Sequence, residues 1–198
     1  MVLEFYRHHE ILPISPEDKA RFIQDYKNNK KADLITAAAF ARDNAVSYRN
    51  FKVGAAIMSK EPNQASGEYS IYSGHNYKPE PAEQEGIAKR CAEKMALEQA
   101  LANHTNFIPA IISVSDKIST GSDSQAHDAL HPCNECRAMI RQLKKEGLLS
   151  GESIICNVND SRLGRDGNWA EEERTVDELL SLYSGEETSE ENQIAAAA

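Results

Sequence analysis

Apolar positions recur with helical spacing in some segments of the chain and form short continuous runs in others. Between residues 15 and 45 the spacing is helical, and Ser15 followed by Pro16 and two acidic residues is typical of a helix start. The polar run at 28–31 predicts a break that divides this region into two helices. Three more helices are expected over residues 90–101, 134–145 and 175–183, the last with Thr175 as its cap.

Short apolar runs predict strands between these helices. They cover residues 51–58, 69–77, 110–114 and 153–158. In the last run Ile154, Cys156 and Val158 alternate on one face, as core residues do. The three glutamates at 171–173 are interpreted as a solvent-exposed face or a helix start. The order of elements predicts an α/β fold, a three-layer α-β-α sandwich with a mixed sheet of about five strands.

Size and charge narrow the possibilities. The chain has 198 residues, 40% of them hydrophobic, which is enough for one good core. We expect an N-terminal helical extension at 1–32, a main domain at 33–184 and a disordered acidic tail at 185–198. A net charge of -9 argues against a nucleic-acid polymer as partner, since such binding depends on clustered Lys and Arg. No apolar run approaches the roughly 20 residues needed to cross a bilayer, so we expect a cytoplasmic protein without membrane contact.

Three of the four cysteines stand at the starts of two predicted helices. Cys91 opens one helix in a Cys-x-Glu sequence, and Cys133 and Cys136 open the next in a Pro-Cys-x-x-Cys sequence. In an intracellular protein such cysteines indicate metal ligands rather than disulfides. The free N–H groups of a helix start favour thiolates, and three thiolates facing one point form a zinc site. A fourth position left to water is the mark of a catalytic zinc.

Two charged residues follow Cys91 on the same predicted helix. Glu93 is placed to take a proton from water at the open position and to deliver it to a substrate. Lys94, three residues after Cys91, is hypothesised to offset the negative charge of the thiolates from outside the ligand shell. A closed structural site with Cys156 as fourth ligand is the alternative, but the alternation around Cys156 favours a packed core thiol.

At these residues the sequence resembles the cytidine deaminase superfamily. The two cysteine sequences are similar to the catalytic boxes of that family. Further segments match in family order: Ser-Tyr-Arg-Asn-Phe-Lys-Val-Gly-Ala-Ala at 47–56, Gly-His-Asn at 74–76 and Thr-Val-Asp-Glu-Leu-Leu at 175–180. The resemblance spans roughly residues 33 to 183, and cysteine before x-Glu resembles the free-nucleoside and blasticidin S branches.

The resemblance implies a site and a reaction. Cys91, Cys133 and Cys136 would bind zinc, and Glu93 would move the protons while a cytosine-type base is hydrolysed to the uracil product and ammonia. The remaining contacts implied are Phe51 as a wall of the base pocket, Asn76 on a ribose hydroxyl, and backbone groups near Ala92 and Pro132 on the base edge. A homo-oligomer is also implied, with a tetramer favoured over a dimer.

The sequence departs from the family at Lys78, where nucleoside deaminases usually carry a glutamate. A carboxylate accepts a hydrogen bond from a ribose hydroxyl, whereas an ammonium group can only donate and prefers an anion. The segment 119–130 also lengthens the span between the two boxes. A modified or phosphorylated nucleoside, or a blasticidin S-like antibiotic, is therefore an alternative substrate. A non-catalytic zinc-binding homologue acting as a binding subunit is the alternative of another class.

His131, just before Pro132, is interpreted as a loop residue packing beside the site.

Overall fold

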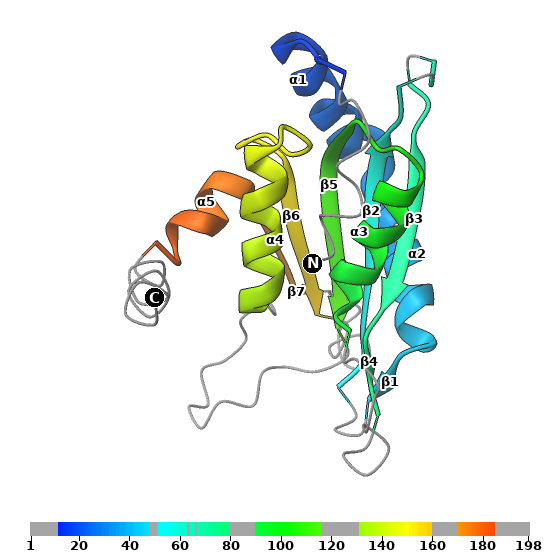
Figure 1. Ribbon diagram of the computed structural model, residues 1–198. Helices are drawn as coiled ribbons and strands as arrows, with labels where there is room; N and C mark the ends of the chain where they lie inside the picture. The colour runs from blue at the N-terminus through cyan, green and yellow to red at the C-terminus, as the bar shows by residue number, and fades with distance from the viewer. Residues whose placement is uncertain are drawn as a thin grey trace.

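A computed structural model describes residues 12–47, 51–62, 64–65, 67–79, 90–115, 131–159 and 170–184. A mixed sheet of five strands lies between two layers of helices (Figure 1). Its strands stand in the order β3-β2-β5-β6-β7. They are β2 (Val53–Lys60), β3 (Ser70–His75), β5 (Phe107–Ser115), β6 (Ile154–Asn159) and β7 (Ala170–Thr175). The predicted three-layer α/β fold is confirmed.

The order and direction of the strands place the starts of two helices at the same end of the sheet. All neighbouring strands are antiparallel except β5 and β6, which are parallel. Helix α3 (Ala92–Ala102) precedes β5 and runs antiparallel to it, so that its last residues lie near the start of β5. Helix α4 (Asn134–Lys145) lies between β5 and β6 in the chain. Both helices therefore begin near the carboxyl end of β5. A short parallel pair, β1 (Val46–Ser47) with β4 (Tyr77–Lys78), forms a second small sheet.

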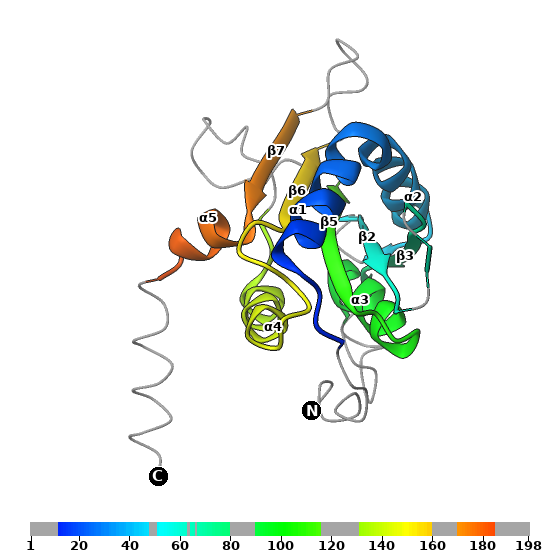
Figure 2. The same ribbon diagram turned by 90° about the horizontal axis from the view of Figure 1, so that it is seen from above.

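Each face of the sheet is covered by its own helices, as the view from above shows (Figure 2). On one face, side chains of α3, α4 and α5 (Val176–Ser181) pack with Ala55, Ile57 and Ile155. On the other face, the N-terminal helices pack with Ala56, Met58 and the alternating residues of β5 and β6. Because side chains of a strand alternate between faces, the near-continuous apolar runs of β2 and β5 serve both layers.

The N-terminal region holds two α-helices, as predicted, but a π-helical turn joins them where a break was expected. Helix α1 (Pro16–Asp25) is capped by Ser15, whose Oγ accepts a hydrogen bond from the Asp18 N–H at 3.1 Å. A π-helical turn, η2 (Tyr26–Lys30), then leads directly into α2 (Lys31–Asp43). Phe22 and Tyr26 lie in the same core as the sheet. The boundary at 32/33 falls inside α2 and stays a prediction.

Of the two interpretations of the glutamate run, the helix start was wrong, because these residues form the edge strand β7, whereas Glu171 and Glu173 are solvent-exposed as the other interpretation predicted. Strand β7 pairs with β6 along one side, and Lys31 forms ion pairs with Glu171 and Glu173. Helix α5 begins after Thr175 with a capping box to Glu178.

Cys156 is fully buried among the core residues of β6, as predicted. No helix in the described part of the chain is long and apolar enough to cross a membrane. The predictions for segments 119–130 and 185–198 lie outside the described residues.

Candidate active site

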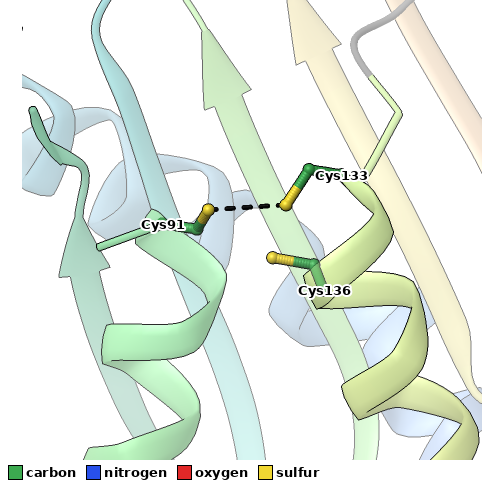
Figure 3. Close-up of side chains that lie close together, drawn as sticks. All are labelled: Cys91, Cys133 and Cys136. Carbon is green, nitrogen blue, oxygen red and sulfur yellow. Dashed lines mark hydrogen bonds between the residues drawn. The ribbon is translucent and has the colours of Figure 1, made fainter. Parts of the chain in front are cut away.

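The starts of α3 and α4 bring three sulfur atoms together (Figure 3). Cys91 and Cys133 are the N-cap residues of the two helices, both with extended backbone and without a side-chain cap hydrogen bond. Cys136 follows Cys133 by one turn, so that its side chain points to the same place. The N–H groups and dipoles of two helix starts therefore stabilise negative charge on the sulfurs.

The spacing of the sulfurs fits a single metal ion. The three Sγ atoms lie within 4.8 Å of one another, and those of Cys91 and Cys133 are 3.4 Å apart. Tetrahedral zinc with Zn–S bonds of about 2.3 Å needs sulfurs about 3.8 Å apart. Cys156 lies instead in the core on the opposite face of the sheet, near Glu171 and Glu173. The alternative of a closed four-cysteine site with Cys156 is therefore wrong.

The hydrogen bonds among the sulfurs favour a thiolate at Cys133. Hydrogen bonds from the thiols of Cys136 and Cys91, helped by backbone N–H groups at the helix start, hold the pKa of Cys133 far below its usual range. The same two bonds, in which Cys133 is the acceptor, raise the pKa of the Cys91 and Cys136 thiols. A divalent cation would replace the shared protons and allow all three sulfurs to ionise.

Glu93 is held beside the sulfurs on the first turn of α3. Its Oε1 accepts a hydrogen bond from Ser113 Oγ at 3.2 Å, and its Oε2 lies 3.7 Å from the Sγ of Cys136. Burial raises the pKa of this carboxyl, and the hydrogen bond from Ser113 acts in the opposite direction. A carboxyl group with a raised pKa suits the acceptance and return of a proton near neutral pH.

An open pocket adjoins this centre, with an empty volume of about 410 Å³ that includes space continuous with solvent. Its lining residues are Phe51, Val53, Asn76, Lys78, Cys91, Ala92, Glu93, His131 and Cys133. The sequence-predicted residues Phe51, Asn76, Lys78 and Ala92 thus lie in one pocket with two of the cysteines and Glu93.

Two predicted residues, Pro132 and Lys94, lie outside the pocket lining, and Asn76 within it is already hydrogen-bonded. Pro132 is not in the pocket lining; its carbonyl accepts a hydrogen bond from Arg137 Nη1 at 2.7 Å. Lys94 is half-buried on α3 and also outside the pocket lining. Asn76 is buried, and its amide bonds to the backbone that leads into β2, with Nδ2 donating to Phe51 O at 2.8 Å and Oδ1 accepting from Val53 N at 2.9 Å.

Sequence reasoning missed Ser113 and gave His131 no specific contact. Ser113 is one of two buried serines in the apolar strand β5, and a buried hydroxyl in such a strand indicates a hydrogen-bond partner. His131 is held by Glu172 and Tyr183, which lie 41 and 52 residues away in sequence. No local pattern marks such a long-range contact.

Comparisons with known proteins found one matching sequence family and proteins of similar fold. The sequence profile described as the cytidine and deoxycytidylate deaminase zinc-binding region matches residues 28–151. The fold is similar to that of a cytidine deaminase from Burkholderia pseudomallei, with 24% identity, coverage of 75% of this chain and 94% of that one, and a TM-score of 0.51. A cytidine deaminase from Mycobacterium leprae gives 24% identity, coverage of 77% and 98%, and a TM-score of 0.48. No curated protein matches the sequence significantly.

Proposed function

Because the chain belongs to the cytidine and deoxycytidylate deaminase family, we propose that it is a zinc-dependent hydrolase that deaminates a cytosine-type base in a free nucleoside. The products are the uracil nucleoside and ammonia. One observation supports this most strongly: three converging sulfurs lie beside a buried carboxyl group at a small-molecule pocket. A purely structural metal site would have no need of Glu93 or of the pocket.

In this proposal Cys91, Cys133 and Cys136 hold the zinc ion. Zinc supplies Lewis-acid activation of the attacking water. Glu93 accepts a proton from that water and passes it to ring nitrogen N3 as the new C–O bond forms at C4. Glu93 then takes the proton of the new C4 hydroxyl and passes it to the amino group, the C4=O bond forms as the C4–N bond breaks, and ammonia leaves. Ser113 keeps the carboxylate oriented through its hydrogen bond to Oε1.

The other pocket residues orient the nucleoside. Phe51 provides an apolar wall for the base, and backbone groups near Ala92 and Pro132 bond its edge. Asn76 is proposed to bond a ribose hydroxyl. The two hydrogen bonds of its amide to the Phe51–Val53 segment also hold the Phe51 wall in place. Each end of the amide keeps capacity for one more hydrogen bond, so the ribose hydroxyl can be bound at the same time.

One observation favours a second substrate class. Lys78 lines the pocket, and within the described residues no hydrogen bond or ion pair engages its ammonium group. An uncompensated cation favours an anionic substituent, so a phosphorylated nucleoside is the second candidate. Lys78→Glu should reverse a preference for cytidine monophosphate over cytidine. An unchanged ratio of the two kcat/KM values would exclude this role.

The test of the main proposal is a substrate panel on the zinc-loaded protein. Loss of ultraviolet absorbance would be followed with cytidine, deoxycytidine, their monophosphates and blasticidin S. Glu93→Ala should reduce turnover by about 10²–10⁴-fold while zinc stays bound. Glu98→Gln is the matched control, because this carboxylate lies on the same helix, faces Arg90 at 3.4 Å and is outside the pocket.

Two outcomes would overturn the proposal. Activity in Glu93→Ala within tenfold of wild type would remove the proton shuttle. Absence of turnover for the whole panel, with one zinc per chain, would favour the non-catalytic binding homologue. A homo-oligomer, tetramer before dimer, and a cytoplasmic location belong to the same proposal; the four cysteines, all free thiols, are compatible with a reducing compartment.

A further inference from the structure

His131 is a pocket residue whose two ring nitrogens are both occupied by protein groups. Its Nε2 lies 3.0 Å from Glu172 Oε2, and its Nδ1 lies 2.5 Å from the hydroxyl of Tyr183. An ionised carboxylate can only accept, so Nε2 donates to Glu172, while Nδ1 shares a hydrogen bond with the Tyr183 hydroxyl. The ring therefore presents carbon atoms, and no free donor or acceptor, to the pocket.

The two partners of His131 are themselves fixed. Glu172 Oε1 forms an ion pair with Arg174 on the same strand. The Tyr183 ring stands nearly perpendicular to His131, with centroids 5.9 Å apart, and lies 3.8 Å from the guanidinium carbon of Arg137. Arg137 in turn donates to the Pro132 carbonyl. Strand β7 and the segment just after α5 thus set the orientation of one wall of the pocket.

We propose that His131 is a further substrate-positioning residue, a flat wall for the planar base, and that Tyr183 acts through it as a remote positioning residue. This inference rests on the proposed function. A rigid ring without free polar atoms provides a flat contact surface for a bound heterocycle. Its contribution to the binding free energy depends on the ring being held in one orientation. The contact between the His131 ring and the base is present both before and during the reaction, so its loss should weaken substrate binding more than it slows the chemical step.

The experiment is a double-mutant cycle on binding. Kd for cytidine would be measured by calorimetry on zinc-loaded Glu93→Ala protein, which does not depend on turnover. Tyr183→Phe removes the hydroxyl and retains the ring over Arg137. We expect it to raise Kd about three- to tenfold, the equivalent of one hydrogen bond. In a His131→Phe background, where Nδ1 is absent, the same change should alter Kd less than twofold.

Kinetics on the active protein give a second measurement. Tyr183→Phe should raise KM by a similar factor, with kcat within about twofold of wild type and zinc content unchanged. Tyr72→Phe is the matched control: its hydroxyl also forms one side-chain hydrogen bond, donated to Glu61 at 2.5 Å, at the end of the sheet away from the pocket. The control should leave Kd and KM unchanged.

The outcomes separate this inference from the proposed function. Loss of turnover in wild type with cytidine binding and the predicted coupling intact would overturn the deaminase proposal alone. An unchanged Kd in Tyr183→Phe, equal effects in both backgrounds, or loss of zinc from Tyr183→Phe would overturn the positioning role. Failure of cytidine to bind the Glu93→Ala protein would also overturn it.

Discussion

Gly74→Ala should displace the helix that positions Cys91 and Glu93, because α3 lies directly on the backbone of β3. A Cβ atom at Gly74 would meet Ala96 N at 2.5 Å, Ala92 O at 2.6 Å and Met95 Cβ at 2.7 Å. Two of these three atoms are backbone, so no side-chain rotation relieves the clash. Ordinary contacts between such atoms are about 3.5 Å or longer, so α3 must move away by about 1 Å.

This displacement has a predicted size in stability and in rate. Overpacking of this kind costs about 1–3 kcal/mol, and replacing glycine gives back about 0.4–1 kcal/mol from the unfolded chain. A net loss of about 1–2 kcal/mol would lower Tm by about 2–8 °C for a domain of this size. Cys91 and Glu93 move with the helix start, and a 1 Å misplacement at a reacting centre costs up to about 100-fold in rate.

The measurements are thermal unfolding, zinc content and kcat/KM on the best panel substrate. Ser73→Ala is the control, because the neighbouring side chain points to the other side of the same strand. We expect Ser73→Ala to retain the wild-type Tm and rate. If Gly74→Ala matched the wild type in all three measurements, the close packing of β3 against α3 would be refuted as the support of the site.

Three other predictions follow from single residues. Lys94→Gln should weaken zinc retention against a competing chelator and lower turnover, because it removes a positive charge one residue from Glu93; wild-type values in both would exclude the charge-offsetting role. A chelator should abolish turnover and make Cys91 and Cys133 reactive toward a thiol reagent, whereas Cys156, fully buried, should react only on unfolding; readdition of zinc should reverse both effects. For Glu172, burial raises the pKa, but hydrogen bonds from His131 and Arg174 outweigh it and hold the pKa below its usual value. Because the pKa of Glu172 is lower in the folded state, its stabilisation is complete above the unfolded value of about 4.3 and is lost as the pH falls through the folded value. The Tm difference between wild type and Glu172→Gln should therefore be constant from pH 7 to about 5 and shrink below about 4. A constant Tm difference down to about pH 3 would contradict this prediction.

Local chemistry was readable from the sequence because it depends on neighbours within one helical turn. The cap at Ser15, the bounds of α4 at residues 134–145 and the facing pair Cys133 and Cys136 all follow from i to i+3 geometry. The alternation around Cys156 likewise separated a core thiol from the ligands. These features have the same physical cause in any fold that contains the same short segments.

Only the tertiary structure decided which local features meet. Cys91 and Cys133 are 42 residues apart and come together because two helices start at one end of β5. Strand β7 has no apolar pattern because it is an edge strand that forms by pairing with β6. Its Glu171 and Glu173 are neutralised by ion pairs with Lys31, which is distant in sequence. Ser113 and Glu93, like His131 and Tyr183, are joined by contacts that chain connectivity alone does not specify. Packing of distant elements therefore determines the shape of the pocket, while the sequence by itself determined the chemistry available to it.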